Sequence, residues 1–419
     1  MKIRIAYIFL IVFSFACSSE RGDSEKKQGS EQYVVMLSMD GFRWDYSEKA
    51  NTPNLDYIEE VGVHADASIP CFPTKTFPNH FSIATGLYPE NHGIVFNDFY
   101  ANDINKFYSI SNTESVADSS FYFGEPIWVT AEKQGVKSAS YFWVGSEAMH
   151  DKIFPSYSHN YNGSVPFEKR IEGVIEWLEL PENERPHLIM WYIQEPDSKG
   201  HDVGPNHHET VEMVEYLDSL VGVFIQKIAA LPIADNINVI VTSDHGMGEI
   251  SEERVVYLDK LIQKDWIEHI DGGNPVYSIG AKEEFYDTIY SILSNSDHLQ
   301  IWKKEDVPER LHFSKSKRIK DFIVVADSSW SLSKSSKKKS YSGGAHGYDN
   351  RNKDMHTIFY AYGPAFKKGY NHKSINAIDI YPLICKILKI EPKKVDGSLE
   401  NTIQMLQIKN DKGEIGKNL

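Results

Sequence analysis

Cysteine is scarce in this chain, and its hydrophobic runs are short. Cys17, Cys71 and Cys385 are the only cysteines in 419 residues, and their spacing matches no zinc-binding or disulfide framework. Cys71 and Cys385 could form one long-range disulfide, although two buried free thiols are the simpler expectation. The apolar stretch IAYIFLIVF near the start falls well short of the ~20 residues that a membrane-spanning helix requires. These shortages exclude a disulfide-rich scaffold and disfavour a membrane span in this stretch.

Positive charge is also in short supply. The chain has 44 Lys and Arg against 59 Asp and Glu, which gives a formal net charge of −15. Proteins that bind duplex nucleic acid need clustered positive charge, so this class is disfavoured. A small anionic substrate would need local cations, which bound metal could supply. With 41% hydrophobic and 25% charged residues the chain is typical of a globular protein, and nothing in it predicts an obligate protein partner.

The first 31 residues are expected to lie outside the fold. MKIR is a short basic region, IAYIFLIVF is apolar, and SFAC supplies small residues before Cys17, so 1–17 resembles an export signal with a bacterial lipobox. Ser14 stands where such a motif has an aliphatic residue, which leaves a cleaved signal without a lipid and an uncleaved anchor as alternatives. Residues 18–31 form a polar tether. We therefore expect export to the periplasm or cell surface, with a lipid on Cys17 attaching the protein to the envelope membrane.

The rest of the chain predicts one α/β domain over 32–405, followed by a polar tail over 406–419. Nearly continuous apolar runs are typical of buried parallel strands, and helix-like stretches separate them. The best helical stripe covers 211–228. This alternation predicts a doubly wound, mostly parallel central sheet with helices on both faces, and the less regular region 250–340 predicts a small inserted lobe. The expected strands are 33–39, 138–144, 187–193, 237–243 and 356–362.

Acids and histidines follow several of these runs. Ligands of doubly wound sheets bind beyond the carboxyl ends of the strands, so residues far apart in sequence should meet at one edge. Three carboxylates and three imidazoles exceed the needs of one tetrahedral ion, but they suit two metal ions if one further oxygen joins them. The candidates are Asp40, Asp197, His201, Asp244, His245 and His346.

Thr76 in TKTFPNH can provide the further oxygen. A metal bound to a threonine hydroxyl lowers its pKa and makes an alkoxide nucleophile available. The alternative is a helix N-cap ahead of Pro78, and the two roles are compatible because a helix N-terminus favours an anionic ligand.

These motifs, in this order, resemble those of the nucleotide pyrophosphatase/phosphodiesterase family of the alkaline phosphatase superfamily. The resemblance runs from LSMDGFRWDY through PTKTFPNHFSIATGLYPENHGIVFN, QEPDSKGHDVGP and VTSDHGM to AHGYDN. It implies an alkaline phosphatase-like fold and two zinc ions, with Asn97 donating a hydrogen bond to a phosphate oxygen. One zinc ion would be held by Asp197, His201 and His346, and the other by Asp40, Thr76, Asp244 and His245.

The resemblance also implies a substrate and a reaction. Family members that accept nucleotides hold the base between aromatic rings, and the matching positions are Phe77, Tyr161 and Tyr192. We therefore expect hydrolysis of nucleoside triphosphates to the monophosphate and pyrophosphate, and of nucleotide diesters, through a phosphothreonine intermediate on Thr76.

Three other functions stay open at this point. Relatives cleave choline-bearing lipids such as lysophospholipids, and a lipid tail also packs on aromatic rings. CFPTK resembles the sulfatase motif in which a cysteine, here Cys71, becomes formylglycine, but Lys75 replaces the arginine of that motif. The third alternative is a surface-tethered binding protein without catalysis, which the intact set of candidate ligands disfavours.

Overall fold

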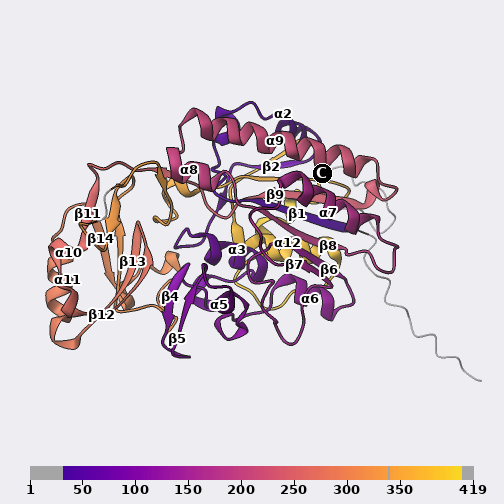
Figure 1. The fold of residues 1–419 in the computed structure, drawn as a ribbon. Helices are drawn as coiled ribbons and strands as arrows, with labels where there is room; N and C mark the ends of the chain where they lie inside the picture. Colours follow the sequence, from indigo (N-terminus) through magenta and orange to yellow (C-terminus); the bar gives the residue numbers. More distant parts are fainter. Residues whose placement is uncertain (1–31, 338–339, 408–419) are drawn as a thin grey trace, which may run out of the picture.

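The computed structural model of the chain describes residues 32–337 and 340–407. The predicted signal with Cys17, the tether, and residues 408–419 of the tail lie outside these ranges. Within them, two units lie side by side: a large α/β body and a smaller lobe, drawn in orange at the left of Figure 1. None of the helices in these ranges is both long and apolar enough to cross a membrane.

The central sheet of the body contains eight strands in the described chain and is mostly parallel, as predicted. β1 (Tyr33–Met39) lies in the middle and pairs in parallel with β8 and β9. The run at 356–362 is an exception, because its strand β18 runs antiparallel to β9 and to β2. The order is β19 (Tyr370–His372), β2 (Val63–Ala65), β18 (Phe359–Tyr362), β9 (Ile237–Thr242), β1, β8 (Leu188–Ile193), β6 (Ser138–Tyr141) and β7 (Tyr157–His159).

Helices cover both faces of this sheet, which confirms the doubly wound architecture (Figure 1). Successive side chains of a strand point to opposite faces, so Val34 and Met36 enter one hydrophobic core while Val35 and Leu37 enter another. The predicted helical stripe forms the long helix α9. One face carries α2 (Pro53–Val61), α7 (Phe167–Glu179) and α9 (His208–Ala229), and the other carries α3 (Thr76–Thr85), α6 (Ile127–Lys133) and α12 (Ile380–Leu388).

The lobe is more regular than the sequence suggested for 250–340. An antiparallel sheet of four strands, with its own hydrophobic core, forms there in the described residues. Its strands β13 and β15 are buried along their whole length, and Val276, Ile323 and Val325 also enter the core of the body. Its elements are β11 (Val255–Tyr257), α10 (Leu258–Leu261), β12 (Ile267–Gly273), β13 (Val276–Ala281), α11 (Tyr286–Ser294), β14 (Leu299–Lys303), β15 (Phe322–Ala326) and β16 (Ser331–Ser333).

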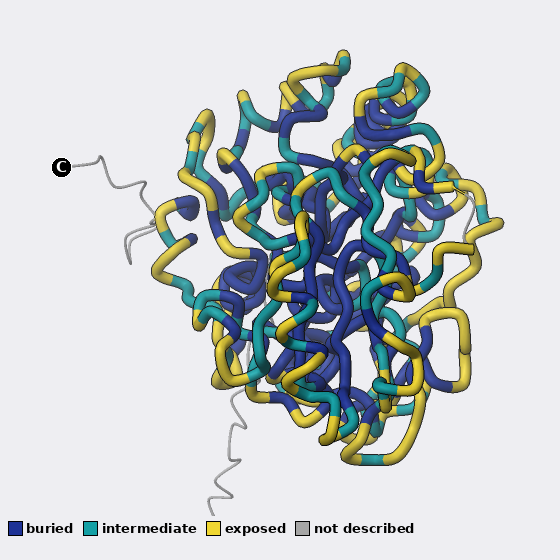
Figure 2. Tube along the Cα trace, turned by 90° about the vertical axis from the view of Figure 1, so that its left-hand side faces the viewer, coloured by how far each residue is buried: buried dark blue, intermediate teal, exposed yellow. Residues whose placement is uncertain are grey.

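A hairpin of the body ties the two units together. Asp271 Oδ1 in β12 accepts a hydrogen bond from the backbone N–H of Tyr100 at 3.0 Å, and Lys320 Nζ donates to the Tyr100 carbonyl at 2.7 Å. Buried backbone runs through the centre of the body, and exposed loops surround it (Figure 2). The remaining elements near the site are the hairpin strands β4 (Asp98–Ala101) and β5 (Lys106–Ser109), the helix α8 (Asp197–Val203) and the strand β17 (Gly344–Ala345).

Candidate metal and active site

Three neighbouring strands place acids at one edge of the central sheet. Asp40 directly follows β1, Asp197 begins α8 shortly after β8, and Asp244 follows β9. The backbone N–H of Asp197 donates to the Asp40 carbonyl at 2.9 Å, so the chain segments that leave β1 and β8 are bonded to each other. The carboxyl ends of parallel strands thus converge as the sequence predicted.

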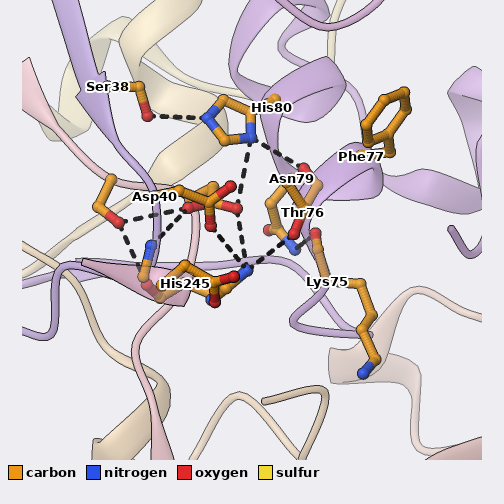
Figure 3. A network of polar contacts seen from close by, with 12 residues as sticks. Ser38, Asp40, Lys75, Thr76, Phe77, Asn79, His80 and His245 are labelled. Carbon is orange, nitrogen blue, oxygen red and sulfur yellow. Dashed lines mark hydrogen bonds and ion pairs between the residues drawn. The ribbon is translucent and has the colours of Figure 1, made fainter. Parts of the chain in front are cut away.

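One group of ligand atoms is fully enclosed. His245 Nε2 lies 3.3 Å from Asp40 Oδ1 and 3.1 Å from Asp244 Oδ2. Thr76 Oγ1 lies 3.1 Å from the same nitrogen (Figure 3). Candidate ligand atoms of Asp40, Asp244 and His245 all lie within 4.8 Å of one another, which is the spacing that a shared metal ion requires.

A second group lies beside the first and is more open. Asp197 Oδ1 lies 3.5 Å from His201 Nε2 and 3.7 Å from His346 Nε2, and these three residues again bring ligand atoms within 4.8 Å of one another. The rings of His245 and His346 stack with centroids 3.5 Å apart, so the two groups are adjacent. His201 is exposed and His346 is buried, so the second group is the one that solvent reaches.

Backbone carbonyls orient all three histidines. Nδ1 of His201, His245 and His346 lies 2.8, 2.9 and 2.8 Å from the carbonyls of Gly344, Gly246 and Thr74, respectively. A carbonyl only accepts, so each Nδ1 carries the proton and each Nε2 presents its lone pair to the carboxylates. Such orientation of the ring is typical of histidines that bind metals.

The three carboxylates lack partners on the sides that face these nitrogens. Asp40 Oδ1, Asp197 Oδ1 and Asp244 Oδ2 are buried and accept no hydrogen bond within the described chain. Burial, together with the neighbouring aspartates, raises the pKa of Asp40 and of Asp244 well above its usual range, and burial raises the pKa of Asp197. Oxygen and imidazole donors with unsatisfied lone pairs fit divalent cations, which would stabilise the ionised carboxylates.

Thr76 is presented to this site by the start of α3. Lys75 occupies the N-cap position and Thr76 is the first helical residue, so the alternative of Thr76 as the N-cap is wrong. Asn79 fixes the preceding loop: its Oδ1 accepts from Cys71 N at 2.7 Å, and its amide donates to the carbonyls of Pro73 and Lys75, each at 3.0 Å. The side chain of the buried Lys75 points away from the Thr76 hydroxyl (Figure 3), and its Nζ donates to the backbone carbonyls of Asn274 and His346 at 2.6 Å each. The Thr76 hydroxyl therefore faces the ligand group from a rigid support.

Asn97 lies next to this helix start. Its Oδ1 accepts a hydrogen bond from the Phe77 backbone N–H at 3.1 Å. That bond fixes the orientation of the amide, so the NH₂ group, which bonds no acceptor among the described residues, is turned outward as a donor. Phe77 is half-buried and its ring points away from the network of Asp40 and His245 (Figure 3).

The two predicted tyrosines adjoin each other but differ in exposure. Tyr161 is 51% exposed and Tyr192 is 8% exposed, and their ring centroids are 6.0 Å apart. Tyr192 also reaches the ligand group, because its hydroxyl donates to Asp40 Oδ2 at 2.7 Å. The structure records no contact between Phe77 and either tyrosine in the described residues.

The sequence interpretation missed a buried histidine behind the site. His80 Nδ1 lies 3.0 Å from the Thr76 carbonyl and 3.3 Å from Asp244 Oδ2, and its Nε2 lies 2.9 Å from Ser38 Oγ (Figure 3). It supports both the nucleophile segment and a carboxylate. The signal was present, because His80 follows Thr76 by four residues and therefore lies one helical turn along.

Both described cysteines are free and buried, which confirms the simpler expectation for them. Burial raises the pKa of the Cys71 thiol to about 12. Cys71 belongs to neither ligand group, so no feature of its surroundings supports the formylglycine alternative.

Comparison with known proteins identifies similar chains. A family model described as "Type I phosphodiesterase / nucleotide pyrophosphatase" matches residues 34–349. Human ectonucleotide pyrophosphatase/phosphodiesterase family member 5 is 38% identical over 400 residues, which cover 95% of this chain and 83% of that protein. Venom phosphodiesterase 2 of Crotalus adamanteus is 35% identical over 393 residues, which cover 91% of this chain but 48% of that protein. The chain thus spans less than half of this larger relative.

Solved structures agree with the sequence matches. Murine family member 5, in an inactive threonine-to-alanine variant in complex with AMP, superposes with a TM-score of 0.86 at 37% identity. The match covers 90% of this chain and 100% of that one. Human family member 5 superposes with the same TM-score at 38% identity.

Proposed function

Because the chain belongs to the type I phosphodiesterase/nucleotide pyrophosphatase family, we propose that it hydrolyses phosphodiester and pyrophosphate bonds of nucleotides at Thr76. The observation that carries this proposal is the placement of the Thr76 hydroxyl 3.1 Å from His245 Nε2, beside buried carboxylate oxygens that lack partners. A threonine hydroxyl gains nucleophilic character only when a base or a metal takes up its proton or its charge.

We propose two Zn²⁺ ions as the resident cofactors. When bound, zinc ions lower the pKa of coordinated hydroxyls and water and neutralise charge on phosphoryl oxygens. The unpaired carboxylate oxygens and the three Nε2 lone pairs support this choice, because zinc accepts such mixed nitrogen and oxygen donors. The ligands would be Asp197, His201 and His346 for one ion, and Asp40, Thr76, Asp244 and His245 for the other.

In the reaction that we propose, the Thr76 oxygen attacks phosphorus in line with the leaving group. A phosphothreonine diester forms and the leaving group departs. The outward NH₂ group of Asn97 donates a hydrogen bond to a nonbridging phosphoryl oxygen, which holds the phosphate against α3. A water then attacks from the opposite side and releases Thr76, so a nucleoside triphosphate yields the monophosphate and pyrophosphate.

We propose that Tyr161, Tyr192 and Phe77 contact the base. Base stacking on aromatic rings tolerates any base, so the residues favour nucleotides without selecting one. AMP in the structure of murine family member 5 supports a nucleoside monophosphate unit as the recognised part. The inactive threonine variant of that protein supports a threonine nucleophile.

The ends of the chain bear on its domain division and its location. We propose an export signal at 1–17, a tether at 18–31, a catalytic domain at 32–405 and a tail from 406, with export to the periplasm or cell surface. Relatives named as ectonucleotide enzymes support export. Attachment through a lipid on Cys17 rests on the lipobox-like sequence.

Hydrolysis by the zinc-loaded protein tests the function directly. We expect p-nitrophenyl-TMP to be cleaved in preference to p-nitrophenyl-phosphocholine, and a strong chelator to abolish turnover that zinc restores. Thr76→Ala should remove activity by at least about 10³-fold, whereas Thr76→Ser, which keeps a hydroxyl, should retain part of it. Preference for the choline ester would contradict the nucleotide substrate, and full activity of Thr76→Ala would contradict the nucleophile.

A further inference from the structure

A buried arginine without an acidic partner lies behind the two tyrosines of the site. Arg170, on α7, has 0% exposed surface. The ionisable groups around it are Tyr141, Tyr161 and Tyr192 rather than carboxylates, and burial lowers its pKa. Burying a cation without an acidic partner costs several kcal/mol of folding free energy. We therefore expect the Arg170 hydrogen bonds to fill a role that a neutral side chain could not.

The guanidinium joins two segments of the chain. Its Nε donates to the Val165 carbonyl at 3.1 Å and its Nη2 approaches the Gly163 carbonyl at 3.5 Å, both in the loop that follows Tyr161. Its Nη1 donates to the carbonyl of Tyr192 in β8 at 3.1 Å. The rings of Phe142 and Phe167 flank the cation, with centroids 5.1 and 4.8 Å from Cζ.

Tyr161 needs such external support. Its side chain is 51% exposed, so packing alone does not fix the ring. It contacts the Phe142 ring at 5.5 Å between centroids, and its backbone N–H donates to Glu147 Oε1 at 2.7 Å. The loop that continues from Tyr161 reaches strand β8 through Arg170, and Gln194 adds only a 3.5 Å contact from its Nε2 to the Gly163 carbonyl, so the guanidinium is the main link that sets the separation of Tyr161 from Tyr192.

We propose that Arg170 is a positioning residue for the nucleoside end of the substrate, which it serves by holding the Tyr161 loop against the Tyr192 strand. This inference rests on the proposed function. A planar guanidinium bonds several carbonyls in one plane while it stacks on aromatic rings, and a lysine ammonium does neither in the same way. Arg170→Lys therefore keeps the charge but loses the link.

Two esters with the same leaving group test this role. p-Nitrophenyl-TMP carries a nucleoside, and methyl p-nitrophenyl phosphate does not. For Arg170→Lys we expect KM for the nucleotide ester to rise about tenfold, as for the loss of one stacking platform, while kcat and hydrolysis of the methyl ester stay nearly constant. Arg185→Lys is the matched control, because Arg185 also donates to a tyrosine, Tyr33 Oη at 3.1 Å, but at the start of β1, away from the site.

A double-mutant cycle separates positioning from general destabilisation. If Arg170 acts through Tyr161, then Arg170→Lys should change KM by less than about twofold in a Tyr161→Ala background. An equal loss of kcat/KM with both esters, or an undiminished rise of KM in the Tyr161→Ala background, would overturn the inference.

A second variant applies if Arg170→Lys does not fold. Phe167→Leu removes one of the two rings that flank the guanidinium, so it should raise KM for the nucleotide ester and not for the methyl ester. An unchanged KM for the nucleotide ester would overturn the inference. If the wild-type protein hydrolysed p-nitrophenyl-TMP no better than methyl p-nitrophenyl phosphate, that result would instead refute the proposed function itself.

Discussion

Replacing Gly343 by alanine should damage the more open ligand group through a backbone contact. Gly343 has φ +82°, and a Cβ there would lie 2.1 Å from the His201 carbonyl and 3.0 Å from that of Asp202. Such overlaps force β17 away from α8. The carbonyl of the next residue, Gly344, orients His201 through a hydrogen bond of 2.8 Å, so this ligand should lose its orientation.

Gly135→Ala separates this effect from backbone strain. Gly135 has φ +77°, but a Cβ there would meet no atom within 4 Å. Gly135→Ala should lose about 1–2 kcal/mol of unfolding free energy, the cost of a left-handed conformation for a residue with Cβ, and Gly343→Ala should lose more because its Cβ also overlaps backbone atoms. Only Gly343→Ala should lose zinc affinity as well, by about 10- to 100-fold, as expected when a partner that orients a metal ligand is displaced.

Zinc affinity from chelator competition, kcat/KM with p-nitrophenyl-TMP and urea unfolding measure the three quantities in both variants. We expect kcat/KM of Gly343→Ala to fall at limiting zinc and to recover partly in excess zinc, while Gly135→Ala keeps wild-type values. Equal zinc affinity in the two variants would refute the argument that the Gly343 contact maintains this ligand group.

The other predictions concern a hydroxyl, a buried histidine and the metal. Tyr192→Phe keeps the ring but removes the 2.7 Å hydrogen bond to Asp40, so zinc affinity should fall about tenfold with little change in nucleotide KM; unchanged affinity would contradict this role. Burial lowers the pKa of His92 to about 3, below its unfolded value of ~6.5, so its stability contribution is complete above pH ~6.5 and is lost as pH falls, by at most about 1.4 kcal/mol per unit. In urea unfolding, His92→Gln should flatten this pH dependence, and parallel profiles would exclude His92 as its source. Chelation should lower Tm, and zinc at 100 times its Kd should restore about 2.7 kcal/mol of unfolding free energy for each of the two sites; an identical Tm with and without zinc would rule out binding to the native state.

The sequence predicted the centre of the fold better than its periphery. The run at 33–39 became β1 over the same residues because a strand buried on both faces must be apolar throughout. The direction of β18 was not predictable, since antiparallel and parallel buried strands have similar composition. In the lobe, β12 gives no apolar run because Asp271 is its one buried residue, whereas β13 and β15 are short and antiparallel, so no helix-like stretch separates them in the pattern of a parallel sheet.

The sequence also predicted some residues of the site and missed others. Most candidate ligands lie just beyond the ends of strands, and Asp197 and His201 lie on the short helix after β8, so the convergence of strand ends predicted their proximity. Arg170 and His80 lie inside helices and look like ordinary helical residues. The spacing of four residues placed His80 beside Thr76, but the contacts of Arg170 with Tyr192 and of His80 with Ser38 join segments distant in sequence, and only the folded structure reveals those.

The central claim is that seven side chains of this chain hold two zinc ions around Thr76. Anomalous diffraction from crystals of the zinc-loaded protein, measured on both sides of the zinc absorption edge, tests this claim most directly. We predict two peaks, one among Asp197, His201 and His346 and one among Asp40, Thr76, Asp244 and His245. A single peak, or zinc bound instead at the surface cluster of His207, His208 and Glu209 with both groups empty, would contradict it.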